Sequence, residues 1–422
     1  MGSFVDYIKK IWGTEDLRKD IGFVFLILII YRIAAHVPVP GINIEGLRAF
    51  FNANQFFGLL NIFSGGGLAN FSVIMLGVGP YITSSIIVQL LTMVVPSLEE
   101  LSKEGESGMR KINQYTRYLT VPIAVIQAYG FISLLQNQSR LIQNFSFQQW
   151  LFVIVVVTAG SMFLTWLGEL ISDKRVGNGV SLLIFAGIVA GLPTGLQRTA
   201  AVFTVTEILS LVAFAVVALL TVVAIVIMND AQRAIPVSYA RTGRLGGSVT
   251  HLPLRLLQAG VIPIIFAISI LVFPNMIAQF LSSASSEMVR EAAKWVTTIL
   301  QNQIVYAGIY FVLVVAFTYF YTAVVFHPDK IADNLQKQGG FVPGIRPGIA
   351  TADNLRKVMN RVTGAGAVFL GIIAILPLVI QPLTGITTLA IGGTSILIVV
   401  SVVIDSVKKI QAQLVMRDYD VL

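Results

Sequence analysis

The sequence predicts an all-α polytopic membrane protein with ten transmembrane helices, arranged as two five-helix halves of inverted topology. Of the 422 residues, 55% are hydrophobic and only 12% are charged, whereas soluble domains carry roughly 25% charged residues. Apolar runs long enough to cross about 30 Å of hydrocarbon occur ten times along the chain. Lysine and arginine are concentrated in alternate connections between these runs, and this bias predicts an orientation.

The first apolar run ends in H-V-P-V-P-G without a small-residue cleavage site, so we expect a retained span and not a signal peptide. In chain order the predicted spans cover residues 21–37, 71–95, 118–135, 151–168, 176–192, 208–228, 259–281, 304–326, 362–380 and 386–404. They divide the chain into an N-terminal segment (1–20), a first half (21–192), an external connector (193–207), a second half (208–404) and a C-terminal tail (405–422).

The charge distribution places both termini in the cytoplasm. With that orientation, 23 of the 29 lysine and arginine residues lie on the cytoplasmic side and 5 lie on the opposite side. Arg32 alone falls inside a span, the first one. Cytoplasmic connections of membrane proteins carry an excess of basic residues, so this arrangement supports ten spans with both ends inside.

Each half is interrupted by glycine and proline in its second span. The first half carries Gly77-Val78-Gly79-Pro80, and the second carries Gly260-Val261-Ile262-Pro263. Matching interruptions in two halves point to inverted repeats with a working site between them. The alternative is that glycine and proline are simply common in membrane helices.

The candidate chemistry favours a passage over an enzyme or a coupled transporter. The chain has no cysteine, its three histidines are isolated, and it contains no H-E-x-x-H, phosphate-loop or G-x-S-x-G motif. We therefore predict no catalytic residues, no metal and no cofactor. A secondary transporter for a small solute remains the alternative, although such proteins usually keep ionisable residues at membrane depth. We expect Arg32 to have a structural role, snorkelling or capping a neighbouring helix.

Two cytoplasmic connections, 229–258 and 327–361, are long, basic and rich in turn-forming residues. The second contains G-G-F-V-P-G-I-R-P-G at 339–348, in which prolines fix φ and glycines permit tight turns. Arg346 is therefore expected at a shaped tip. A basic tip suits a phosphate backbone or an acidic protein surface, although basic loops are also where membrane topology places them.

Several long, irregular stretches then identify a family. They are YRIAAHVPVPGI (31–42), NIFSGGGLANFS (61–72), GPYITSSIIVQLLT (79–92), KEGESGMRKINQYTRY (103–118), WLGELISDKRVGNGVSLLIFAGIVAGLP (166–193), THLPLRLLQAGVIPIIFAISILVFP (250–274), FYTAVVFHPDKIADNLQKQGGFVPGIRPG (320–348) and GGTSILIVV (392–400). In these stretches the chain resembles the SecY family of bacterial protein-translocation channels. The resemblance covers nearly the whole chain, roughly from Leu17 to Met416.

The resemblance implies an hourglass-shaped central pore between the two halves. A short plug helix at about 61–72 would block the outer funnel; its residues are Asn61, Phe63, Ser64, Gly65, Gly66, Gly67, Leu68 and Phe71. A mid-membrane ring would be formed by Val78, Ile82, Val180, Ile184, Ile265 and Ile398. Aliphatic side chains around a narrow opening favour dewetting, which resists ion leakage.

A lateral gate would lie between spans 2 and 3 on one side and spans 7 and 8 on the other. The residues assigned to it are Thr83, Ser84, Gln89, Gln127, Ser269 and Phe273. Parting of this seam would let an apolar segment move sideways into lipid.

The resemblance further implies partners and a location. Docking of the SecA motor and of the ribosome, through its RNA and the proteins near the exit tunnel, would use Arg241, Arg244, Arg346, Lys337, Arg356 and Lys357. Other expected partners are SecE-like and SecG-like small membrane subunits, signal peptides, nascent chains and membrane lipids. The expected location is the bacterial inner membrane, as a multi-pass protein.

Overall fold

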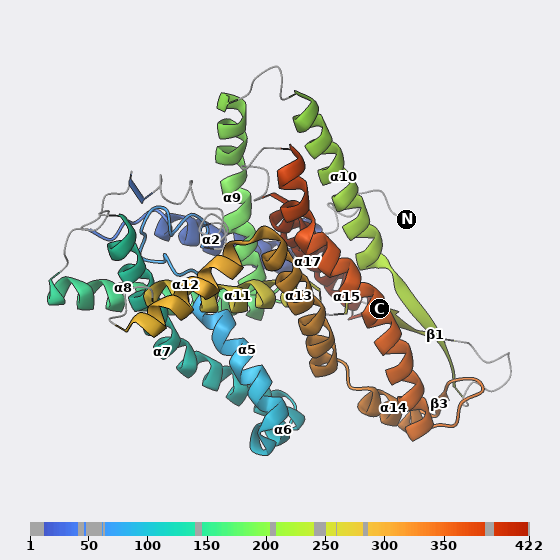
Figure 1. Cartoon of the computed structure of the whole chain (residues 1–422). Coiled ribbons are helices and arrows are strands. Elements are labelled where there is room, and N and C mark those ends of the chain that lie inside the picture. The colour runs from blue at the N-terminus through green and yellow to red at the C-terminus, as the bar shows by residue number, and fades with distance from the viewer. Residues whose placement is uncertain are drawn as a thin grey trace.

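The computed structural model describes residues 12–40, 46–47, 61, 64–139, 146–202, 208–239, 250–258, 260–281, 286–384 and 392–420. Most of these residues are helical (Figure 1). The helices are α2 (Glu15–Ala34), α5 (Gly79–Val94), α6 (Pro96–Lys103), α7 (Glu106–Ser139), α8 (Phe147–Asp173), α9 (Gly179–Val202), α10 (Ile208–Asp230), α11 (Ile262–Leu281), α12 (Glu287–Gln301), α13 (Gln303–Val325), α14 (Pro328–Lys337), α15 (Ile349–Thr384) and α17 (Gly392–Asp420).

Within the described residues, three helical stretches are by themselves long and apolar enough to cross a membrane. They are Phe147–Asp173, Gln303–Lys337 and Ile349–Ile380. Helices α5 and α6 reach the length and hydropathy of a membrane span only together, and the chain bends by 100° between them. Val95 is extended at this bend and Pro96 opens the second helix, as expected from the restriction that proline places on the residue before it.

The two interrupted spans begin later than the sequence-based prediction, and both differences have the same cause. Helix α5 begins at Gly79 and not at residue 71, and α11 begins at Ile262 and not at residue 259. Gly77 and Gly260 each adopt a φ of 59°. This left-handed conformation favours glycine and is incompatible with a right-handed helix, so the helix can begin only after it. In both halves a proline then occupies the second helical position, where no backbone N–H is needed.

Two segments predicted as connectors are helical where described. Helix α9 continues through Pro193 to Val202, into the predicted external connector. Helix α17 continues to Asp420 and includes most of the predicted C-terminal tail.

One hydrophobic core joins the two halves. Its buried helical members come from α2, α5, α8 and α9 of the first half and from α10, α11, α13, α15 and α17 of the second. A second cluster packs residues 68–75 against α7 and α8. On the outside, large apolar side chains such as Phe25, Leu219 and Val312 are more than half exposed, as expected for helices that face lipid.

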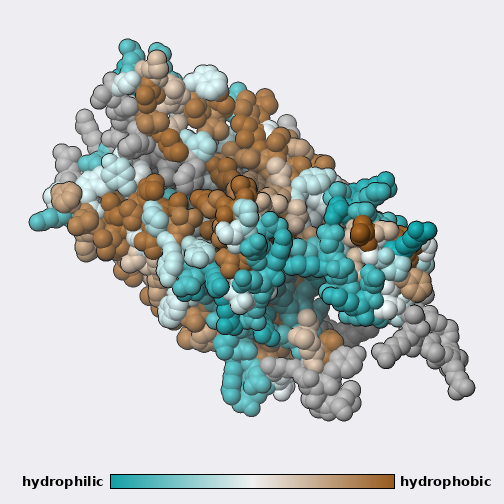
Figure 2. Space-filling model, turned by 90° about the horizontal axis from the view of Figure 1, so that it is seen from below, coloured by the Kyte–Doolittle hydropathy of each residue, from teal (hydrophilic) through white to brown (hydrophobic). Residues whose placement is uncertain are grey.

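A small antiparallel sheet, which was not predicted from the sequence, joins the two long basic connections, 229–258 and 327–361. Strand β1 (Gln232–Tyr239) pairs with β2 (Thr250–Arg255) on one side and with β3 (Gly340–Phe341) on the other. A separate core of Ile235, Leu254, Phe326, Val342, Leu355 and Met359 lies beneath it. This end of the molecule, seen from below, carries a broad hydrophilic area beside apolar flanks (Figure 2).

Candidate functional site

Residues assigned separately to the ring, the plug and the gate meet around one cavity of about 80 Å³. The cavity is apolar on most of its wall, with a few hydroxyl and amide groups at one side. Its lining comprises Ser64, Leu68, Leu76, Val78, Gly79, Ile82, Thr83, Gln127, Phe131, Ile184, Ile265, Ile268 and Ser269. Segments from both halves of the chain therefore converge where the matching glycine–proline interruptions predicted a site.

Four of the six predicted ring residues line this cavity: Val78, Ile82, Ile184 and Ile265. Ile398 is fully buried in the same core. The side chain of Val180 instead lies over Gly168 of α8, within about 3.4 Å of where a Cβ there would stand. The structure thus gives Val180 a helix-packing contact and leaves it out of the cavity wall.

Besides Gly79 of the first glycine–proline interruption, three lining residues were not assigned from the sequence: Leu76, Phe131 and Ile268. The last two could have been found from helical spacing. Ile268 follows Ile265 by three residues, and Phe131 follows Gln127 by four, so each shares a face with an assigned residue. Leu76 precedes α5 in a run of turns, where no such period applies.

In the described part of the predicted plug, Asn61 is helical and the residues from Ser64 onward form a compact set of turns. Residues 64–71 are turns, held by hydrogen bonds from the side chains of Asn61 and Ser64. The Ser64 hydroxyl accepts from the Leu68 N–H at 3.0 Å, and the Asn61 amide oxygen accepts from the Ala69 N–H at 2.8 Å. Gly65 and Gly66 have positive φ, which a right-handed helix does not allow. Phe63 lies outside the described residues.

The predicted plug packs against α2 and α9, and we call the contacting residues Tyr31, Arg32 and Gly187 its seat. Arg32 donates from Nη1 to the carbonyl oxygen of Gly65 at 2.7 Å. The Tyr31 hydroxyl lies so close to Gly65 that any side chain there would overlap it. A Cβ on Gly187 would stand only 2.7 Å from the Gly65 Cα. Arg32 is therefore structural, as expected, but its partner is a plug carbonyl and not the end of a helix.

The other end of the plug is fastened by backbone pairing with the segment that follows α2. The Val39 N–H donates to the Phe71 carbonyl at 2.8 Å, and the Val73 N–H donates to the Val37 carbonyl at 3.0 Å. The plug is thus tied through its backbone at its C-terminal end and by one arginine and close glycine contacts at its middle.

The polar side chains assigned to the gate make hydrogen bonds within their own half. Thr83 and Ser84 donate to carbonyls one turn back in α5, and Ser269 donates to the Ile265 carbonyl in α11. Gln127 of α7 reaches the Thr83 hydroxyl at 3.4 Å, and the Gln89 amide donates to the Ser85 hydroxyl. The side chain of Phe273 is not among those described.

The contact between the halves at this seam is largely apolar. Helix α11 packs against both α5 and α7, and Ile82 and Ile265 belong to one continuous core. Among the described residues, ion pairs lie away from this seam and within one half: Arg117 pairs with Glu169 at 2.7 Å in the first half, and Lys408 pairs with Asp230 at 2.7 Å in the second. Parting of the seam would therefore mainly expose apolar surface.

The three-stranded sheet supports the loop that carries Arg346. Gly339, Gly344 and Gly348 all have positive φ, and Thr351 donates its hydroxyl to the Arg346 carbonyl at 2.9 Å. The Arg346 side chain is exposed. As predicted from the glycine and proline pattern, the arginine lies on a shaped loop.

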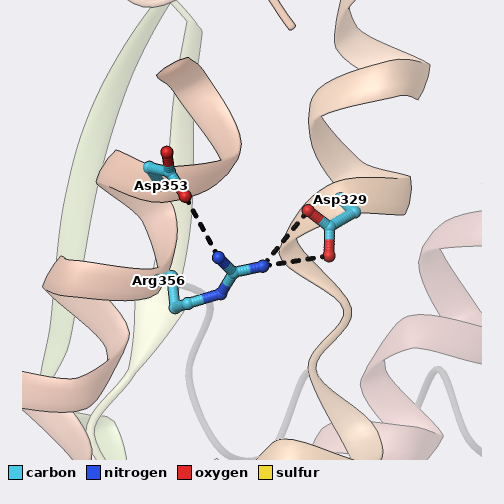
Figure 3. A network of polar contacts seen from close by, with 3 residues as sticks. All are labelled: Asp329, Asp353 and Arg356. Carbon is cyan, nitrogen blue, oxygen red and sulfur yellow. Dashed lines mark hydrogen bonds and ion pairs between the residues drawn. The ribbon is translucent and has the colours of Figure 1, made fainter. Parts of the chain in front are cut away.

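Arg356, which was assigned to docking, is held by two carboxylates. Its guanidinium lies 3.2 Å from both carboxylate oxygens of Asp329 in α14 and 3.0 Å from Asp353 in its own helix, α15 (Figure 3). Lys337 and Lys357 are exposed. Arg241 and Arg244 lie outside the described residues.

Comparisons with known proteins identify the family of this chain. The family model described as SecY matches residues 72–407. The protein translocase subunit SecY of Mycobacterium tuberculosis (strain ATCC 25618 / H37Rv) is 43% identical over 435 residues, which cover 96% of this chain and 97% of that protein. The corresponding subunit of Halalkalibacterium halodurans is also 43% identical, over 429 residues that cover 98% of each chain.

Solved structures of similar fold include one described as a protein-conducting channel, with a TM-score of 0.63 and 17% identity. Another is canine Sec61 in a ribosome–channel complex, with a TM-score of 0.61 and 17% identity. Each match covers 93% of this chain and 91% of the other. The all-α polytopic fold is thereby confirmed.

Proposed function

This chain belongs to the SecY family, and from that membership we propose that it is the pore-forming subunit of a bacterial protein translocase. It conducts unfolded secretory polypeptides across the cell membrane and releases transmembrane segments sideways into lipid. It is a passive channel and not an enzyme, and its termini face the cytoplasm.

The observation that carries this proposal is the shared cavity of ring, plug and gate. Val78, Ile82, Ile184 and Ile265 surround a narrow apolar space, in which water is poorly held, so ions meet a dewetted barrier. Aliphatic side chains can also close around a moving polypeptide without hydrogen bonds to its sequence. The apolar seam beside the ring offers a lateral exit. When the seam parts, lipid or an apolar segment can cover the apolar surface that it exposes.

The three-stranded sheet, α14 and the Arg346 loop form a platform on the side that we place in the cytoplasm, and this platform supports a driven channel. The exposed Arg346 on its sheet-backed loop presents a fixed positive charge to a motor such as SecA, or to a ribosome. One relative of similar fold, canine Sec61, is described in a ribosome–channel complex. SecE-like and SecG-like subunits would complete the membrane assembly. Arg32, the one charge inside a predicted span, is bonded to the plug, which disfavours a role in ion-coupled solute transport.

Polar substitution in the ring tests the pore assignment. Ile265→Asn and Ile398→Asn each place an amide in a buried apolar setting, where water would be drawn in to solvate it. Loss of about 1.4 kcal/mol of closed-state stability corresponds to about a tenfold change in the closed-to-open ratio, so we expect resting ion conductance to rise at least about tenfold in planar bilayers. Val216→Asn, at a half-exposed position on α10, is the control. Unchanged conductance in both ring variants would contradict the assignment.

Arg356 is proposed to position the platform and not to contact a partner directly. Exposed ion pairs contribute about 0.2–1 kcal/mol, so Arg356→Met should slow SecA-driven export in vesicles by less than about tenfold. Asp329→Asn removes the same link between α14 and α15 and should cause a similar defect. If Arg356 met a partner's anion directly, Asp329→Asn would leave export unchanged or faster, and the positioning role would be wrong.

Purification of the membrane complex tests the function as a whole. Recovery of a small SecE-like membrane subunit with this chain is expected of a translocase. A chain that purifies alone and binds a small solute would favour the transporter alternative.

A further inference from the structure

Helix α12 is amphipathic, with an apolar and a polar face. Met288, Ala292, Trp295 and Ile299 recur at helical spacing along one side. The adjoining side carries the charged and hydroxyl residues Glu287, Arg290, Glu291, Lys294 and Thr298, with Glu291 at the border, about one turn from both Met288 and Trp295. Neither face belongs to the pore, the plug or the platform described above.

Only part of the apolar face is used in packing. Helix α12 packs on α11, and Ala293 on that edge is 3% exposed. Further round the same apolar face, Met288 is 81% exposed and Trp295 is 68% exposed. The helix therefore has one apolar flank against protein and a second flank without a protein neighbour in the described chain.

The exposed flank continues into an outer surface of the same kind. Asn302 ends α12 and caps α13, accepting from the Ile304 N–H at 3.1 Å. Ile304, in the first turn of α13, is 83% exposed, and Val312 two turns later is 63% exposed. Helix α13 is apolar along its length and is followed directly by α14, so a membrane-spanning α13 would place α12 at the surface opposite the basic loops.

We propose that α12 lies in the membrane–water interface, with Met288 and Trp295 inserted among phospholipid chains just below the headgroups. A tryptophan at this depth and a charged face toward water are typical of interfacial helices. Arg290 and Lys294 on the polar face can meet lipid phosphates. Because α12 connects α11 and α13, it tethers the outer ends of both gate helices to the lipid surface; this role rests on the proposed function, whereas the lipid contact does not.

Tryptophan fluorescence tests the lipid contact without any transport assay. The chain has four tryptophans, so a variant with the other three changed to phenylalanine reports on Trp295 alone. In liposomes of brominated phosphatidylcholine, we expect a loss of Trp295 emission, strongest for bromines near the headgroup end of the chains. A variant that keeps only Trp166, which is 54% exposed on α8, is the matched control for a tryptophan on a spanning helix.

Two outcomes would overturn the inference. Strong quenching of Trp295 by aqueous acrylamide, without quenching by brominated lipid, would place α12 in water. Protection from both quenchers would mean that another protein covers the flank. Failure of either kind would leave the channel function standing, since that function is tested by conductance and export.

The tether is tested by Trp295→Glu, which should release α12 from the interface and change the yield of lateral insertion of a marginally apolar reporter segment. Thr298→Glu adds the same charge on the polar face and should leave that yield unchanged. Equal yields in the wild type and Trp295→Glu would contradict the tether even if the fluorescence result held.

Discussion

Replacing Gly187 by leucine is expected to open the resting channel to ions while leaving the ring residues unchanged. A Cβ at this position would stand 2.7 Å from the Gly65 Cα and 3.0 Å from the Tyr31 hydroxyl. Neither neighbour can yield easily, because one is backbone and the other is buried at 2% exposure. The plug would have to leave its seat and lose the Arg32 hydrogen bond to Gly65. Single-channel recording of the purified complex should show frequent openings without substrate.

The same helix supplies a control. Gly191 follows Gly187 by one turn, and a Cβ there would meet nothing within 4 Å, so Gly191→Leu should remain closed. Arg32→Met tests the seat without steric overlap and should give a smaller leak, since it removes one charge-assisted hydrogen bond of about 1.5–3 kcal/mol. A Gly187→Leu channel that stays as tightly closed as the wild type would show that the plug does not need this seat.

Arg346→Glu is expected to abolish most motor-driven export while the protein still inserts normally into the membrane. The fold uses only the backbone carbonyl of this residue, which accepts from Thr351, and its side chain is exposed. The substitution therefore changes the charge of the tip and preserves its shape. Reversal of a charge that faces an oppositely charged partner costs far more than its removal, because attraction becomes repulsion.

ATP-driven translocation into inverted vesicles measures this effect, with the amount of inserted protein determined in the same vesicles. Lys330→Glu is the matched control, because it makes the same charge change at an exposed site on α14 away from the tip. Normal export by Arg346→Glu, or an equal defect in Lys330→Glu, would rule out a specific role for Arg346.

Local sequence rules predicted the parts of the site that depend on neighbouring residues. The two glycine–proline interruptions marked the start of α5 and of α11, because positive φ and a proline in the first helical turn leave a local signature. Apolar length likewise predicted most helices. The shape of the Arg346 loop followed from the same turn chemistry.

Features that depend on distant contacts were missed or misjudged. Strand β3 pairs with β1 across about a hundred residues of chain, which no local pattern reveals. Basic composition could not show that Arg346 is exposed whereas Arg356 is paired with a carboxylate. The partner of Arg356, Asp329, lies on another helix. The plug was expected to be a helix, whereas residues 64–71 form turns shaped by contact with Tyr31 and Gly187.

The unequal fastening of the plug has a kinetic consequence. Its C-terminal end is bound to the chain after α2 through two backbone hydrogen bonds, at Phe71 and Val73, whereas its middle is held by Arg32 and close contacts. A stopper retained at one end stays at a high effective concentration near its seat after release. Reclosure is then a unimolecular step whose rate does not depend on the abundance of the complex, so each pore reseals by itself once its substrate has left.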